Sequence, residues 1–136
     1  MYDNPLRRQY RFPAIDFDAT LGDVCTIAVP KRPGQTQGRG GRVTGVWLEN
    51  VTVEFTAGDS AAGSIQIGDG NDVDKYFDSG ALVTTSEQDA KNIVDVPDTG
   101  SKVDIEVGRS TITVTFNAAT GTGDGTADVV VEVEWD

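Results

Sequence analysis

Histidine is absent from this chain of 136 residues, and cysteine occurs once. Because histidine is the commonest general base and a frequent metal ligand, its absence weighs against an ordinary hydrolase. The single cysteine, Cys25, excludes an internal disulfide framework. It lies in phase with Ile27 and Val29 on one face of a predicted strand, which indicates a small buried side chain rather than a nucleophile. We therefore expect no enzymatic activity, no cofactor and no bound metal.

Long apolar runs and helical periodicity are also missing. No run approaches the ~18 apolar residues that a membrane-spanning helix needs, so we expect no membrane partner. Apolar side chains recur instead at every second position, which is typical of half-buried strands. The clearest case is ADVVVEVEW, where apolar Val129, Val131, Val133 and Trp135 oppose Asp128, Glu132 and Glu134. Glu132 and Glu134 are therefore expected to point to solvent rather than to form a catalytic pair.

The alternating segments are short and are separated by turn signals. They are VCTIAV, VTGVWLENVTVEFT, SIQIG, KVDIEV, STITVTF and ADVVVEVEW. About eight such strands predict an all-β fold, an antiparallel β-sandwich of the jelly-roll or Greek-key type. GRST predicts a tight hairpin between Val107 and Ile112. TSEQDAKN, from Thr85 to Asn92, is expected to form a helical turn.

The segment VTGVWLENVTVEFT carries an interrupted alternation. Glu49 breaks a predicted inward face, so two strands, or one strand bulged near residues 48–50, both fit the pattern. Trp47 and Trp135 both fall on predicted inward phases and are expected in the core. The inward face is formed by Val43, Trp47, Val51, Val53 and Phe55.

Two segments lie outside the alternation. Residues 1–13 contain Pro5 and Pro13 and are expected to form an extended N-terminal arm, followed by a single β-sandwich domain over residues 14–136. Residues 30–42, PKRPGQTQGRGGR, hold two prolines, four glycines and four basic residues. That composition predicts a mobile basic loop.

Charge is distributed unevenly along the chain. Residues 1–42 carry seven basic and four acidic side chains, or +3, whereas residues 43–136 carry four basic and eighteen acidic ones, or −14. The two parts sum to the formal net charge of −11. Because an acidic body repels nucleic acid, we expect no direct nucleic-acid partner.

The N-terminal segment PLRRQYRFP interleaves basic with apolar and aromatic side chains. Arginine and tyrosine are prominent among interface hot spots, so we expect this arm and the basic loop to dock on a sister subunit or another protein. The alternatives are a disordered terminus, and a loop whose cations meet acidic surface of the protein itself. The predicted partner-binding residues are Leu6, Arg7, Arg8, Tyr10, Arg11, Phe12, Arg39 and Arg42.

An aspartate-rich stretch, SIQIGDGNDVDKYF, is the other candidate site. An EF-hand loop counted from Asp69 fails at Val73, Asp74 and Gly80. A polar turn is the favoured interpretation, since Asp and Asn readily make backbone turns. A looser calcium site remains open, formed by Asp69, Asn71, Asp72 and Asp74.

Two blocks of the chain resemble the decoration or cement proteins of tailed-bacteriophage heads. They are GRVTGVWLENVTVEFTAGDSAAGSIQIGDGNDVDKYFDSG and STITVTFNAATGTGDGTADVVVEVEW. The resemblance implies a structural protein on the virion head surface, made in the host cytoplasm, that stabilises contacts between major capsid subunits without catalysis. It also implies a homo-oligomer, a dimer or trimer. The alternatives are a tail or fibre-associated virion protein and a carbohydrate-binding β-sandwich module.

Overall fold

The computed structural model describes residues 6–18, 24–56, 62–82 and 104–136. Within these ranges the secondary structure is entirely β, and no helix long and apolar enough to cross a membrane occurs in them. The helical turn expected from Thr85 to Asn92 lies outside the described residues. The strands are β1 (Leu6–Asp16), β2 (Val24–Ala28), β3 (Gly41–Thr56), β4 (Ser64–Gly68), β5 (Phe77–Asp78), β6 (Thr111–Asn117) and β7 (Asp124–Trp135).

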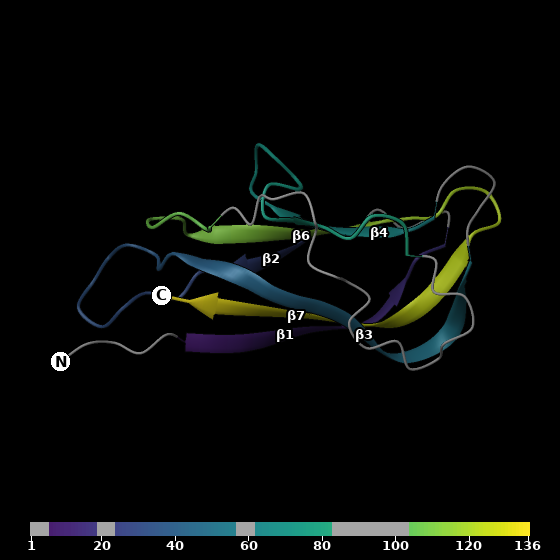
Figure 1. Ribbon diagram of the computed structural model, residues 1–136, viewed down its shortest axis with the longest axis horizontal. Coiled ribbons are helices and arrows are strands. Elements are labelled where there is room, and N and C mark those ends of the chain that lie inside the picture. The colour runs from purple at the N-terminus through teal and green to yellow at the C-terminus, as the bar shows by residue number, and fades with distance from the viewer. Residues whose placement is uncertain (1–5, 19–23, 57–61, 83–103) are drawn as a thin grey trace.

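The strands form two antiparallel sheets that pack as two layers (Figure 1). One sheet has the order β1-β7-β3, and the other has the order β2-β6-β4-β5. Apolar side chains from the inner faces of both sheets form the hydrophobic core. The predicted all-β sandwich is therefore confirmed.

The pairing of the strands is nested. β1 pairs with β7, β2 with β6, and β4 with β5. Gly41 and Ile105 lie in the sequence inside the β2–β6 pair and outside the β4–β5 pair. Gly41, at the start of β3, exchanges backbone hydrogen bonds with Ile105, with N···O distances of 3.1 and 2.7 Å. Each pair thus encloses the next one along the chain, which is the connectivity of a jelly roll.

The core follows the predicted alternation in β4, β6 and β7. Aromatic rings join the layers: the ring centroids of Phe17 and Phe55 lie 5.4 Å apart, and those of Phe17 and Phe116 lie 6.0 Å apart. Cys25 packs against this core beside buried Ile27, as predicted. The fully buried side chains of these three strands include Ile65, Ile67, Ile112, Val114, Phe116, Val129, Val131, Val133 and Trp135.

The predicted phase of β3 is wrong in its centre. Val46 and Leu48 are buried, whereas Trp47 and Glu49 lie on the outer face, and the indole Nε1 donates to Glu49 Oε1 at 2.9 Å. The register against β7 shifts between Val43 and Gly45, and again after Glu49. One extra residue in a bulge reverses the side chains that follow it, because the strand period is two. β3 is one bulged strand, the second of the two predicted alternatives.

The segment before β6 also differs from the prediction. Ile105 is buried, but Val107 is 67% exposed, and Val103 lies outside the described residues. The hairpin predicted between Val107 and Ile112 does not form, because Ile105 bridges to β3 in one sheet while β6 pairs with β2 and β4 in the other. This stretch crosses between the layers.

The residues expected to form a separate arm belong to the sandwich from Leu6 onward. Leu6 pairs with Trp135, and the ladder continues without a shift to Phe12, which pairs with Val129. Leu6, Tyr10 and Phe12 pack against the core because they occupy alternate, inward positions of β1. Their side chains are therefore part of the fold, and their predicted contact with a partner stays a prediction.

Candidate functional site: the outer face of the β1-β7-β3 sheet

Charged and polar side chains cover the outer face of the β1-β7-β3 sheet, which we call the polar face. The register places them in rows that run across the three strands. The rows are Arg7, Glu134 and Arg42; Gln9, Glu132 and Gly45; and Arg11, Val130 and Trp47. Three of the predicted partner-binding arginines therefore meet carboxylates of the same sheet.

Glu134 is held between two arginines. Its Oε2 accepts from Arg7 Nη2 at 2.9 Å and its Oε1 from Arg42 Nη2 at 2.7 Å. These hydrogen bonds lower the pKa of Glu134, and its carboxylate raises the pKa of Arg7 and of Arg42. The Glu134 side chain is only 16% exposed. Arg42 thus follows the alternative in which loop cations meet acidic surface of the protein itself.

Glu132 forms the next row with neutral donors. Gln9 Nε2 donates to it at 3.0 Å and Thr44 Oγ1 at 2.9 Å. The hydrogen bond from Gln9 is the largest cause of its lowered pKa. A glycosidase general acid needs a raised pKa. The pKa values of Glu132 and Glu134 are both lowered, which does not suit that role.

Arg11 lies at the end of the polar face next to the bulge of β1, which falls between Phe12 and Ile15. Its guanidinium forms ion pairs with Glu49 and with Asp128, the latter at 3.0 Å. Asp128 also accepts from Asn50 Nδ2 at 2.9 Å and from the amide of Ala14 at 2.8 Å, and its pKa is lowered, first by Asn50. One carboxylate thereby joins β1, β3 and β7.

The remaining predicted partner-binding residues lie elsewhere. Arg8 is exposed on β1, and no described residue forms a hydrogen bond or ion pair with its side chain. Arg39 lies in the basic loop. The structure therefore brings Arg7, Arg11 and Arg42 together on one face and leaves Arg8 and Arg39 apart from them.

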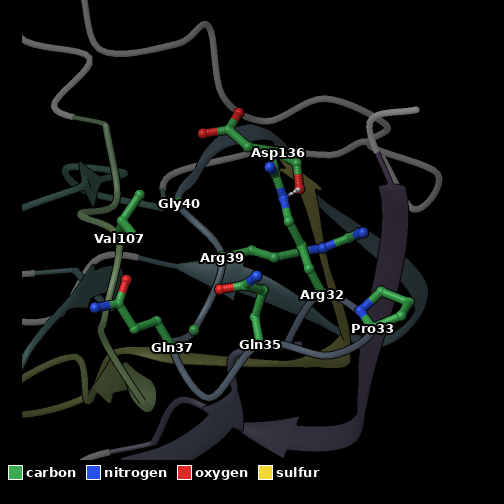
Figure 2. Close-up of a pocket in the computed structure, with 9 residues that line it drawn as sticks. Arg32, Pro33, Gln35, Gln37, Arg39, Gly40, Val107 and Asp136 are labelled. Atoms are coloured by element: carbon green, nitrogen blue, oxygen red, sulfur yellow. Dashed lines mark hydrogen bonds between the residues drawn. The ribbon is translucent and has the colours of Figure 1, made fainter. Parts of the chain in front are cut away.

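The basic loop borders a cavity of about 420 Å³ (Figure 2). Arg32 Nε donates to the backbone oxygen of Asp136 at 3.4 Å across it. The loop is fastened by bonds from the Arg39 amide to Pro30 O at 2.8 Å and from the Gly108 amide to Gly38 O at 2.9 Å. The predicted mobility of the loop stays a prediction. The cavity is lined by Arg32, Pro33, Gln35, Gln37, Gly38, Arg39, Gly40, Val107 and Asp136.

The aspartate-rich stretch forms a turn. Asp69 Oδ1 accepts from the amides of Asn71 at 2.8 Å and Asp72 at 2.9 Å, and these two bonds are the main cause of its lowered pKa. Its Oδ2 lies 3.4 Å from Lys75 Nζ and 3.2 Å from Arg109 Nη2. The carboxylate caps its own backbone, as the polar-turn interpretation predicted. Among residues 6–18, 24–56, 62–82 and 104–136, no group of three or more His, Cys, Asp or Glu could hold a metal ion.

A second ionic cluster fastens this turn to the segment before β6. Glu106 accepts from Lys75 Nζ at 2.5 Å, from Tyr76 Oη at 2.7 Å and from Arg109 Nε at 3.0 Å. These bonds lower the pKa of Glu106, while burial raises the pKa of Tyr76. The sequence analysis missed this cluster because about thirty residues separate Tyr76 from Glu106, and no local pattern links them.

Comparison with known proteins adds one structural likeness. No protein-family model and no curated protein matches the chain. A chain of the cyanophage Pam1 capsid asymmetric unit is similar in structure, with a TM-score of 0.49 and 16% sequence identity. The match covers 97% of this chain and 86% of that one. A likeness at this level leaves the family and the function open.

Proposed function

We propose that this chain is a virion structural protein, and more narrowly a decoration or cement protein on the head surface of a tailed phage. In this role it stabilises contacts between major capsid subunits. The observation that carries the proposal is the nested pairing of β1 with β7, β2 with β6 and β4 with β5. Jelly rolls serve in viral capsid proteins, in lectins and in cupins. Because a fold does not decide a function, the choice among these rests on the side chains.

The side chains favour a binding role without catalysis. Three carboxylates of the polar face, Glu132, Glu134 and Asp128, have lowered pKa values and are engaged in cross-strand bonds. The sequence has no histidine to act as a general base or metal ligand. A surface whose carboxylates are held ionised in cross-strand bonds suits a structural role better than a catalytic one.

A carbohydrate-binding module is the second candidate, and one observation favours it. Trp47 lies half-buried on the polar face, with its indole oriented by Glu49, although the sequence predicted it in the core. An aromatic ring beside hydrogen-bonding side chains is an arrangement that can receive a sugar ring. Loss of glycan binding in Trp47→Ala, on an array where the wild-type protein binds, would favour this candidate.

Co-sedimentation with capsid shells tests the decoration role. The purified protein is mixed with shells of the major capsid protein of the source virus that lack it. We expect saturable binding, at a ratio that is a simple fraction of the capsid subunits, and no binding by an unrelated acidic protein of similar size. Shells that sediment without the protein at every concentration would contradict the proposal.

A further inference from the structure

β1 is an edge strand of its sheet in the part of the chain that the structure describes. β1 pairs with β7 on one side, and no described strand pairs with it on the other (Figure 1). An open edge presents backbone N–H and C=O groups that can bond to another chain. The hydrogen bonds of β3, on the other side of β7, show which residues of β1 point their N–H and C=O groups toward this edge.

Gly41 fixes the direction of these groups. It gives both its N–H and its C=O to Ile105, so they point away from β7. In an antiparallel ladder, opposite residues alternate between hydrogen-bonded and non-hydrogen-bonded pairs. Gly41 and Trp135 are therefore a non-hydrogen-bonded pair, and Trp135 turns its groups toward Leu6 on β1. The Asp136 amide donates to Gly40 O at 2.8 Å, so the next pair, Gly40 and Asp136, is hydrogen-bonded, as the alternation requires.

The same alternation continues along β1. Leu6 and every second residue to Phe12 turn their backbone groups toward β7, whereas Arg7, Gln9 and Arg11 turn theirs toward the open edge. The three edge residues span about 13 Å at ~3.3 Å per residue. Pro13 occupies the next outward position, where the absence of an N–H costs the β1–β7 ladder nothing.

The side chains beside this edge define what it can receive. The Arg7 and Arg11 side chains are 61% and 47% exposed on the polar face, and Arg8 is exposed on the inner side. Arg8 forms no side-chain bond with a described residue, and the exposed parts of Arg7 and Arg11, which also pair with Glu134, Glu49 and Asp128, can attract further acidic side chains. Half-buried Leu6, Tyr10 and Phe12 lie on the inner side and offer apolar contact to alternate residues of an added strand.

We propose that β1 receives an extended segment of a partner protein, in which acidic side chains alternate with apolar ones. Main-chain hydrogen bonds to Arg7, Gln9 and Arg11 hold it, and the arginines select its acids. The inference rests on the proposed function only in taking the major capsid protein as the source of the segment. The partner strand extends the β1-β7-β3 sheet by one strand.

A second copy of this chain fits the edge less well. Antiparallel pairing of two β1 edges about Gln9 places Arg7 of each copy opposite Arg11 of the other. Like charges directly opposite one another destabilise a strand pair. An acidic segment replaces both repulsions with attractions.

Peptide binding followed by NMR tests the inference. The probes are a short blocked peptide that alternates valine with glutamate, and the same peptide with lysine for glutamate. We expect the acidic peptide to shift the amide signals of Arg7, Gln9 and Arg11 and to slow their hydrogen exchange, and the basic peptide to do neither. Gln9→Pro should weaken binding about tenfold or more, since it removes an outward N–H and blocks the edge. The matched control Gln9→Ala keeps the N–H and should bind like the wild-type protein.

Three results would overturn the inference: unchanged β1 amide signals with the acidic peptide, equal binding by Gln9→Pro, or the same shifts caused by protein concentration alone. If Gln9→Pro fails to fold, an N-methyl group at Gln9 gives the same test. It can be introduced by ligating a synthetic segment 1–24 to the rest of the chain at Cys25, the sole cysteine. No virion is used here, so failure of this test leaves the proposed function standing, and failure of shell binding leaves this edge untouched.

Discussion

At the scale of single residues, Tyr10 and Trp135 join the edge strand to the centre of its sheet. Trp135 is fully buried, and its Nε1 donates to Tyr10 Oη at 2.9 Å. A buried indole N–H needs such an acceptor, because an unpaired polar group in the core is costly. The sequence predicted Trp135 in the core, but it could not indicate Tyr10 as the acceptor 125 positions away.

Replacement of Tyr10 by phenylalanine removes this acceptor and little else. We expect Tyr10→Phe to lower the free energy of unfolding by about 1–3 kcal/mol, because it leaves the Trp135 N–H unpaired. Urea denaturation followed by tryptophan fluorescence measures the change. An unaltered denaturation midpoint would contradict the role assigned to this bond.

The cluster around Glu106 predicts a dependence of stability on pH. The folded-state pKa of Glu106 is lowered by Lys75, Tyr76 and Arg109, so the unfolded chain binds a proton more readily than the folded one. Its contribution is therefore full above the unfolded pKa, near 4.5, and is lost as the pH falls toward the folded pKa. We expect Glu106→Gln to be less stable than the wild-type protein at pH 7.

The stability difference between Glu106→Gln and the wild-type protein should shrink as the pH falls below about 4.5. Denaturant titrations of both proteins at several pH values measure it. A difference that stays constant down to pH 3 would show that the Glu106 carboxylate does not supply this stability.

At the scale of the strands, the sequence predicted β4, β6 and β7 well, because each alternates without interruption. It misplaced Trp47, since the bulge near Thr44 adds one residue that only the pairing with β7 reveals. It missed β1 as a strand because Arg8 interrupts the alternation of apolar side chains at Leu6, Tyr10 and Phe12, and because Pro13 is a signal for the end of a strand. On an edge strand both are tolerated: the arginine reaches water, and the proline nitrogen faces outward.

Amide hydrogen exchange gives a direct view of how β1 is paired. The amides of Leu6, Arg8, Tyr10 and Phe12 should exchange slowly, since they bond to β7, and those of Arg7, Gln9 and Arg11 should exchange fast. Residue-resolved exchange followed by NMR measures both sets in one experiment. Uniform protection along β1 would mean that another segment already covers its edge.

Deletion of residues 1–13 tests whether this segment is an independent docking arm or a structural strand of the sandwich. An independent arm would leave the fold intact on removal. Because Leu6, Tyr10 and Phe12 pack against the core, we expect the deletion to cost several kcal/mol and to expose the edge of β7. Circular dichroism and thermal unfolding of the truncated protein measure this. Cooperative unfolding at the wild-type temperature would show that β1 is dispensable.

At the scale of the whole molecule, alternation and turn spacing were enough to predict a jelly-roll or Greek-key sandwich. They could not give the nested pairing, which depends on contacts between distant segments such as Gly41 and Ile105. The charge asymmetry along the chain is real, but Arg7 and Arg11 of β1 form ion pairs with Glu134 and Asp128 of β7 in the same molecule, which the sequence alone did not show. Among the described strands, none pairs with the outer edge of β1.

Quantitative mass spectrometry of purified virions from the source tests the proposed role of the whole molecule. We predict that the protein is present at a copy number that is a simple fraction of the major capsid protein, as a head-surface protein requires. A handful of copies per particle would place it in the tail or connector instead. Its absence from virions would contradict a virion role and would favour the carbohydrate-binding module built around Trp47.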